Sequence, residues 1–346
     1  MSEACRLIGL VVWIGVSITV GVEVSTAIAG PPAEAGEGEQ DAIAMADSNG
    51  ESGRLTAHFN REGVEIREAG SPVLFYQRRP KSLDGKWRRT GYVHPVYDLE
   101  GRVITEDFPE DHRHHRGIFW AWHQVWVGET RLGDPWVCER FEWDVKSIRV
   151  TSPASPLILE SQLHWTSPDW VNEQGEMIPV VAETVQMRVH AASEHSRSID
   201  FDLTLRALVD DVRIGGSEDV KGYGGFSPRI QMSPAREFRD RSGLIEPTKE
   251  AVMAGPWVDL SNEVNGIAIL SHPGNSTPAG DPQAAEFPWI LRRSRSMQNA
   301  VYPGRIPVPL ELGTVKSLKY RLVVHDGERT PEELERCFAD FANSSR

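Results

Sequence analysis

The segment SIDFDLTLRA, residues 198–207, decides the fold class of this chain. Apolar residues occupy every second position of it, and polar or charged residues stand between them: the apolar set is Ile199, Phe201, Leu203 and Leu205. Because successive side chains of a strand point to opposite faces, this alternation predicts a long strand with one face on a core and one in water. The same pattern recurs in residues 183–190 and 318–324.

Turn signals separate shorter strand patterns along the chain from Arg54 onward. Residues 61–63 end in glycine between the strand patterns 56–60 and 64–68, and Glu100 and Gly101 form a similar signal further on. Strands at this spacing, with almost no helical periodicity between them, are typical of antiparallel sandwiches. We therefore expect an all-β protein built as a large antiparallel β-sandwich.

A short helix is expected at the C-terminus. Thr330, Pro331 and Glu333 form a capping box with proline at the first helical position. The apolar residues that follow recur at helical spacing: Leu334, Cys337, Phe338 and Phe341. We expect this helix to dock on the sandwich with that face.

The first 29 residues have the pattern of a signal peptide. Arg6 precedes an uncharged run from residue 7 to 22, and residues 27–29 offer a small-x-small cleavage site. An uncleaved membrane anchor is the alternative, because the run nearly reaches spanning length. Residues 30–53 are rich in Gly, Ala, Pro and acid and contain no Lys or Arg, which predicts a disordered linker.

Residues 54–346 are expected to form one domain, periplasmic or extracellular, with no membrane insertion once the signal is removed. The net charge of −13 argues against a nucleic-acid partner, which would need a basic face. Of the three cysteines, Cys5 belongs to the signal. Cys138 and Cys337 are expected to be buried free thiols rather than a disulfide.

Residues 106–126, EDFPEDHRHHRGIFWAWHQVW, are the candidate site. The first half of this stretch is charged and rich in histidine, whereas residues 118–127 have the aromatic and β-branched composition of a buried strand. A polar loop that runs directly into a buried strand is a typical place for a rigid scaffold to present functional groups.

Proton transfer is the chemistry that these residue types favour. His114 or His115 suits an acid or base near neutral pH, and Arg116 suits an anionic or hydroxyl-rich ligand. His123 lies in the aromatic strand, in register with Phe119 and Ala121, and is either catalytic or a satisfied core histidine. Glu142 is a further candidate for proton transfer, on nearness in sequence alone.

The sequence requires no metal or cofactor. His112 and His114 have the H-x-H spacing of a metal site on a strand, which keeps such a site open as an alternative. No C-x-x-C, H-E-x-x-H or EF-hand pattern accompanies them.

Aromatic and polar residues outside the histidines are candidates for substrate binding. Sugar faces stack on aromatic rings, although a sandwich also needs large side chains in its core. The glycine-rich run 221–229 predicts a bulge at a rim, or a corner that serves only the twist of the sheet. The binding candidates are Trp120, Trp122, Tyr223, Arg229, His272 and Trp289.

Three segments together resemble a known family. TEDFPEDHRHHRGIFWAWHQV (105–125), GYGGFSPRI (222–230) and YRLVVHDG (320–327) are similar to the PmoA-like domain family, often labelled "methane oxygenase PmoA". The resemblance covers about residues 54–343. It implies a galactose-mutarotase-like supersandwich and a link to carbohydrate catabolism, and it brings no catalytic residues with it.

Three hypotheses of function follow. The first is an exported carbohydrate-active protein that uses acid–base chemistry, as an epimerase, lyase or hydrolase, on a small-molecule sugar or sugar derivative. The second is a non-catalytic carbohydrate-binding module that uses the same aromatic and arginine surface. The third, which the family label implies, is a metal-dependent oxygenase. Whether the chain is an enzyme stays open at this point.

Overall fold

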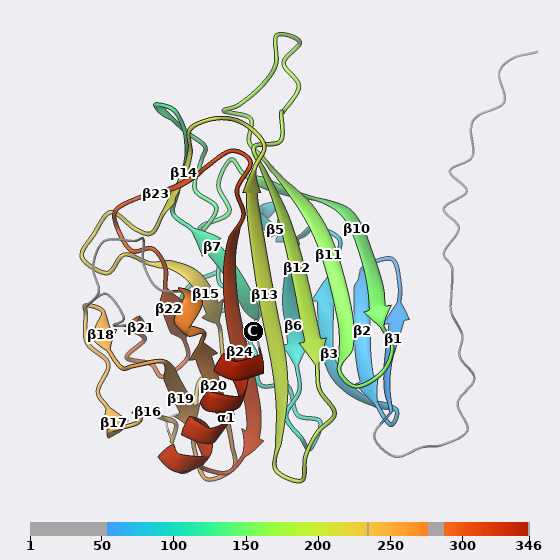
Figure 1. Ribbon diagram of the computed structural model, residues 1–346, viewed down its shortest axis with the longest axis vertical. Coiled ribbons are helices and arrows are strands. Elements are labelled where there is room, and N and C mark those ends of the chain that lie inside the picture. The colour runs from blue at the N-terminus through green and yellow to red at the C-terminus, as the bar shows by residue number, and fades with distance from the viewer. Residues whose placement is uncertain (1–53, 234, 276–286, 345–346) are drawn as a thin grey trace, which may run out of the picture. The chain divides into compact units, whose positions relative to one another are not determined.

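The computed structural model describes residues 54–233, 235–275 and 287–344. The expected signal peptide and linker lie outside these ranges. Two nine-stranded antiparallel sheets dominate the described residues, and α1 (Pro331–Ser344) follows the last strand (Figure 1). The expectation of an all-β antiparallel sandwich with a short C-terminal helix is confirmed.

The first sheet contains the aromatic strand of the candidate site near its middle. Its strands, in spatial order, are β1 (Leu55–Phe59), β2 (Gly63–Glu68), β3 (Ser71–Gln77), β6 (Tyr92–Val96), β7 (Ile118–Trp122), β15 (Gly224–Pro228), β22 (Gln298–Val301), β21 (Pro288–Leu291) and β18 (Val252–Met253).

The second sheet contains the longest strands, which Figure 1 shows in front of the first sheet. In spatial order they are β10 (Glu142–Ser152), β11 (Leu157–Thr166), β12 (Val181–Val189), β13 (Ser196–Ala207), β24 (Lys316–Asp326), β20 (Asn265–Ser271), β19 (Trp257–Ser261), β16 (Glu237–Asp240) and β17 (Gly243–Ile245).

Two small sheets and one short helical turn complete the described elements. They are β23 (Val308–Leu310), β14 (Val212–Gly215), β8 (Gln124–Val127) and β9 (Thr130–Arg131) in one sheet, β4 (Lys81–Leu83) and β5 (Lys86–Arg89) in the other, and the 3-10 turn η1 (Pro273–Asn275).

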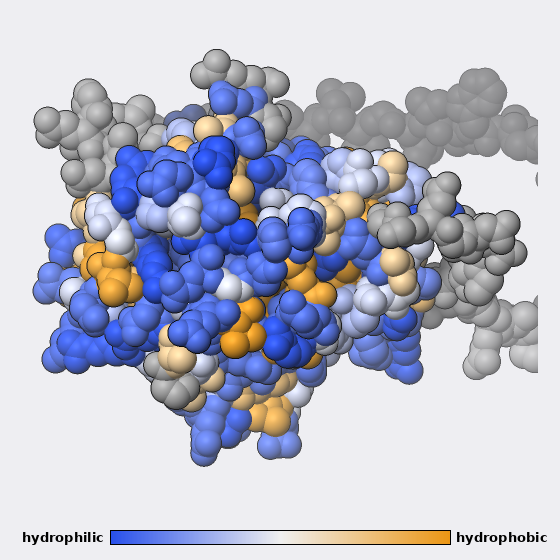
Figure 2. All heavy atoms as spheres, turned by 90° about the horizontal axis from the view of Figure 1, so that it is seen from below, coloured by the Kyte–Doolittle hydropathy of each residue, from blue (hydrophilic) through white to orange (hydrophobic). Residues whose placement is uncertain are grey.

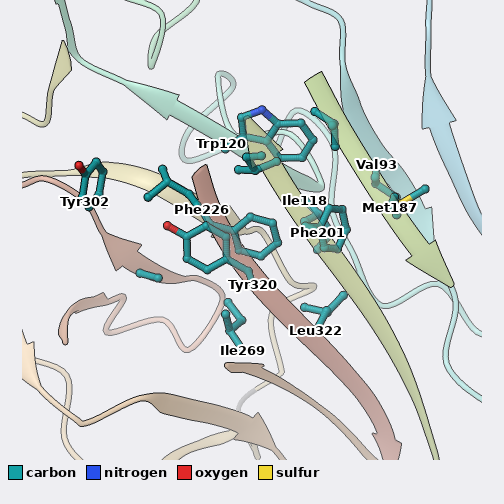
Figure 3. Packing of buried hydrophobic residues seen from close by; sticks show 14 of the residues in the cluster. Val93, Ile118, Trp120, Met187, Phe201, Phe226, Ile269, Tyr302, Tyr320 and Leu322 are labelled. Atoms are coloured by element: carbon teal, nitrogen blue, oxygen red, sulfur yellow. The ribbon is translucent and has the colours of Figure 1, made fainter. Parts of the chain in front are cut away.

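The alternating segment 198–207 lies in β13, which pairs with β12 and β24. Phe201 lies opposite Met187 on one side and Tyr320 on the other, so the apolar positions of three strands coincide on one face. That face packs against the first sheet: Phe226 of β15 stacks on Tyr320 at 4.6 Å and on Trp120 of β7 at 6.3 Å (Figure 3).

The outer face of the second sheet is covered by α1 over β19, β20 and β24. Leu334 and Phe341 of the helix pack on Trp257, Leu270 and Val323. The expected capping box forms, because the backbone N–H of Thr330 donates to Glu333 Oε2 at 2.9 Å. Cys138 and Cys337 are free, as expected, but half-buried rather than buried.

Within the described ranges, no helix is long and apolar enough to cross a membrane. Figure 2, which views the molecule from below, shows a mainly hydrophilic surface with a few separate apolar patches. Isolated exposed apolar residues of this kind, such as Leu244 and Met253, are usual on folded proteins.

Candidate functional site

Strand β7 divides the aromatic stretch between the core and the site. Trp120 and Trp122 point into the core, where their indole N–H groups donate to Glu183 Oε1 (2.7 Å) and to the carbonyl of Tyr302 (2.9 Å). Trp289 is equally buried and donates to the carbonyl of Gly255. These three tryptophans were expected to bind substrate, and the structure instead uses them to fill the space between the sheets.

The opposite face of β7 carries a second apolar cluster that forms the floor of the site. Phe119 and Ala121 of β7 pack there with Trp136, which the loop after β9 brings back over the strand. The backbone N–H of Trp136 donates to the carbonyl of Trp122 at 3.1 Å, which fixes the loop on the strand. Tyr223 packs against the same cluster.

The histidine loop, residues 107–116, lies on this floor. Its ends are joined by a bridge between Asp107 and Arg116. Gly117, which follows, has a φ of 40°, and a Cβ there would meet the carbonyl oxygen of Val93 at 2.1 Å. Because the chain must pass this close to β6, only glycine fits at the junction.

Three histidines of the loop form one ring cluster. The ring centroids are 4.9 Å apart for His112 and His115, 4.6 Å for His114 and His115, and 5.6 Å for His112 and His114. His115 also stacks on Phe119 at 5.8 Å and meets Trp136 edge-on at 6.1 Å. His115 is buried, whereas His112 and His114 are half-buried.

His123 and Asp134 form a dyad beside this cluster. His123 Nδ1 lies 2.8 Å from Asp134 Oδ2, and the His123 ring stacks on Trp136 at 5.3 Å. The other carboxylate oxygen of Asp134 accepts the backbone N–H of Trp136 at 3.0 Å. Because a carboxylate only accepts hydrogen bonds, Nδ1 carries the proton and Nε2 keeps its lone pair. Nε2 has no partner among the described residues and is open to solvent.

His112 is held in the same tautomer as His123, but its Nε2 atom is occupied. The Nη1 group of Arg292 donates to His112 Nε2 at 3.1 Å, so the proton of the neutral ring is on Nδ1, 3.2 Å from Asp111 Oδ2. Burial and the charge of Arg292 lower the pKa of His112. The ring therefore supports its neighbours: its Nε2 atom is occupied by Arg292, and its Nδ1 atom is buried.

His114 makes no hydrogen bond to any described residue, and its ring nitrogens are not among the buried atoms. Burial of the ring lowers its pKa to about 4, and His112, Arg89 and His123 add to the effect. His114 is therefore a neutral imidazole at pH 7 with both nitrogens available. Burial also lowers the pKa of His115 well below its ordinary value, so that its ring is a neutral part of the floor.

The two arginines expected to bind a ligand are fully buried and anchor the loop. Arg116 donates to the hydroxyl of Tyr92 and to the carbonyl of Trp87, and it pairs with Asp107. Arg229 pairs with Asp111 at 2.6 Å and with Glu106 at 3.2 Å. These contacts position the histidine loop on β7 and β15, which assigns Arg116 and Arg229 a structural task.

The comparison with protein families gives a match. A family model matches residues 63–339, which is most of the chain. The chain belongs to DUF6807, a family of unknown function. No curated protein matches it. The expected membership of the PmoA-like family is therefore wrong, because the matching model is that of DUF6807 and nothing found indicates a PmoA-like domain.

Two further candidates lie away from the histidines of this DUF6807 protein. Glu142 stands on β10 of the second sheet and pairs with Arg88 at 2.8 Å. His272 immediately precedes η1 and meets Phe341 of α1 edge-on at 5.4 Å, on the outer side of the second sheet. Of the expected residues, the structure brings together His114, His115, His123 and Tyr223.

Three residues of the site were not expected from the sequence: Arg89, Asp134 and Arg292. Each comes from a loop or strand distant from the histidine loop, with no spacing motif that marks it. Asp134 precedes Pro135 and Trp136 in a short loop. An acidic residue before a proline and an aromatic residue was the one feature of the sequence that could have marked it as a site residue.

No metal centre is evident in the part of the chain that the structure describes, where no group of three or more His, Cys, Asp or Glu side chains is arranged to hold an ion. In the H-x-H pair, the lone pair of His112 Nε2 is not available to a metal ion, because it accepts a hydrogen bond from Arg292.

Proposed function

We propose that this DUF6807 protein acts on a sugar or sugar derivative by histidine acid–base chemistry. The reaction takes place at the histidine face, which we define as His114, His123 and Tyr223. The observation that carries the proposal is the His123–Asp134 dyad, with its 2.8 Å contact and a free Nε2 atom. Imidazole is the side chain best suited to accept a proton near neutral pH, and a positioned base contributes roughly 10²–10⁴-fold in rate.

The surroundings of the dyad support a small polar ligand. Tyr223 is half-buried, packs on Trp136 at 5.5 Å and stands 6.4 Å from His123, so an aromatic wall adjoins the base. A ring of this kind suits the apolar face of a sugar, and the phenol and imidazole groups suit its hydroxyls. The N-terminal sequence adds an exported location to the proposal, where extracellular or periplasmic glycans are available.

The test compares His123→Gln with His58→Gln in turnover of a glycan and monosaccharide panel. His58 is an exposed residue of β1 outside the site, so its variant controls for loss of a histidine. We expect turnover to fall roughly 100-fold or more in His123→Gln and to stay unchanged in the control. Asp134→Asn should also lower turnover, because an amide can donate to Nδ1 and move the ring proton to Nε2.

Unchanged turnover in His123→Gln would refute the proposal. Sugar binding without turnover in the native protein, kept in His123→Gln and lost in Tyr223→Ala, would instead establish the second hypothesis of a binding module. The oxygenase hypothesis loses its basis, since it rested on the label of a family to which the chain does not belong.

A further inference from the structure

We infer that the reaction is proton abstraction next to a carbonyl group, so that the substrate is a sugar with an aldehyde, ketone or carboxyl function. This inference rests on the proposed function and narrows its substrate class. Three features of the described residues lead to it: a base with a free lone pair, a neutral histidine without partners, and a buried arginine without an ion pair.

The neutral histidine is His114. Neither of its ring nitrogens has a hydrogen-bond partner among the described residues, although the ring lies 4.6 Å from His115 in a well-packed cluster. A neutral imidazole donates one N–H hydrogen bond and carries no positive charge. Such a donor suits a carbonyl oxygen that becomes an enolate, and enzymes use lowered histidine pKa values for this task.

The buried arginine is Arg89 at the end of β5, which is 2% exposed. Its guanidinium donates to the carbonyl of Pro135 at 2.6 Å and lies 4.4 Å from the ring of Trp143 and 5.2 Å from that of Phe119. In the described part of the chain it contacts no carboxylate. A desolvated cation of this kind lacks compensation, so negative charge that develops nearby is stabilised.

The charge of Arg89 acts on both sides of the first sheet. It helps to lower the pKa of His114 on the site side and that of Glu183 on the core side. Glu183 is nevertheless held at a pKa of about 7 by its burial, so near neutral pH it is only partly ionised. Arg89 therefore lies beside the floor of the site with no carboxylate partner among the described residues, and its charge reaches the ring of His114.

The step balances without any additional reagent. His123 Nε2 takes the proton from the carbon next to the carbonyl, and the electron pair of that C–H bond forms a C=C bond. The carbonyl π pair moves to oxygen, which accepts the N–H of His114. Return of the proton to the same or the neighbouring carbon gives an epimer or isomer, and departure of a β-substituent gives elimination.

The carboxylates of the site do not favour glycoside hydrolysis. That reaction uses two carboxyl groups about 5–10 Å apart on either side of the bond. Here Glu106 and Asp111 are bound to Arg229, and Asp134 is bound to His123. Each of these three carboxyl groups is therefore already engaged by a basic side chain.

The experiment follows deuterium uptake from D₂O by NMR. The full chain is incubated with a panel of aldoses, ketoses, hexuronates and keto-glycosides, each paired with the alditol or parent glycoside that lacks the carbonyl. We expect exchange only at carbon next to a carbonyl, only in the carbonyl members of each pair, and a fall of roughly 100-fold in His123→Gln. Exchange in no member of the panel would overturn the inference.

Two variant pairs test His114 and Arg89 separately. His114→Gln retains an N–H donor and should keep more exchange activity than His114→Leu. Arg89→Met should slow exchange at least tenfold and raise the pKa of His114 in an NMR titration, whereas Arg89→Lys should retain most of both. A purely structural Arg89 would lower thermal stability in Arg89→Met without moving the pKa of His114, and this would refute its electrostatic part.

The failure of this inference differs from failure of the proposed function. Turnover of a sugar without a carbonyl, dependent on His123 and without deuterium uptake, would refute the inference and leave the proposed function in place. Exchange or turnover that survives His123→Gln would refute both.

Discussion

At the scale of single residues, four histidines of the site and one of the core differ mainly in what their ring nitrogens contact. His112 accepts from Arg292, His123 donates to Asp134, and His114 contacts no hydrogen-bonding group in the described chain. His115 serves as a buried aromatic ring, and His325 lies in the second sheet as the partner of Asp259. Identical side chains therefore have distinct roles, because the neighbours of each ring decide its charge and which of its nitrogens stays open.

Glu183 links stability to pH. It is fully buried and accepts the indole N–H groups of Trp120 and Trp165, and burial raises its pKa to about 7 from an ordinary value near 4.5. A carboxyl group with a raised pKa prefers to be protonated in the folded protein, so its contribution is lost as the pH rises from 4.5 through 7. The shift corresponds to about 3 kcal/mol at most.

We therefore expect the free energy of unfolding of the native protein to fall between pH 5 and pH 8, and to fall less in Glu183→Gln. Urea unfolding at both pH values measures this, with Glu176→Gln on an exposed turn as the control. Equal pH dependence in the native protein and Glu183→Gln would contradict the assignment.

His325 and Asp259 form a fully buried ion pair with an Nε2 to Oδ1 distance of 3.0 Å. Burial opposes both charges, but the pair overcomes it: the pKa of His325 is raised and that of Asp259 is lowered. The contribution of His325 is complete below its unfolded pKa and is lost as pH rises through the raised value. The contribution of Asp259 is present above its unfolded pKa and is lost as pH falls through the lowered value, so the pair stabilises most between about pH 4 and 6.5.

His325→Gln should cost about 3–5 kcal/mol of unfolding free energy at pH 5.5, because it leaves Asp259 buried and unpaired. The exposed pair His195–Asp326, also 3.0 Å apart, provides the matched control, and His195→Gln should cost less than about 1 kcal/mol. Chemical denaturation of both variants decides the point. Similar losses of unfolding free energy in the two variants would mean that burial does not decide how much each ion pair stabilises the fold.

At the scale of elements, the histidine loop depends on how closely the chain passes β6. Gly117 and Gly101 both have positive φ angles, of 40° and 80°. A Cβ on Gly117 would collide with the backbone of Val93, whereas nothing lies within 4 Å of a Cβ on Gly101. The two glycines therefore separate the cost of backbone conformation from that of steric overlap.

Gly101→Ala should lose only about 1–2 kcal/mol, the usual cost of a left-handed conformation in a residue other than glycine. Gly117→Ala should lose more, and the NMR signals of His114 and His115 should shift because the loop must move. Unfolding measurements and histidine spectra of both variants test this. Equal stability losses with unchanged histidine signals in Gly117→Ala would show that the loop does not depend on this contact.

At the scale of the whole molecule, the two sheets have different outer faces. The helix α1 covers part of the second sheet, and its contacts leave Leu270 and Val323 buried on that side. The first sheet is covered instead by the histidine loop and by the loop that carries Asp134 and Trp136. The open ring nitrogens of His114 and His123 belong to this second kind of cover, and we therefore place the candidate site on the first sheet, where loops from distant parts of the chain meet.

The sequence by itself determined the fold class and singled out the histidine loop as the candidate site. Period-two alternation in residues 198–207 implied a strand with one buried face, and the capping box at Thr330 implied the helix, because both signals are local. The concentration of histidine before β7 likewise located the loop that the structure places on the floor of the site. The supersandwich likeness came only with the rejected family resemblance and stays a prediction.

Only the tertiary structure decided what each residue does. Trp120 and Trp122 are core residues because the pleat of β7 turns them inward, and Arg116 and Arg229 are anchors because carboxylates and carbonyls from other loops surround them. Asp134 and Arg89 entered the site from segments that no spacing motif marks. Charge, tautomer and solvent access depend on neighbours that are distant in the chain, so residue type and spacing could not specify them.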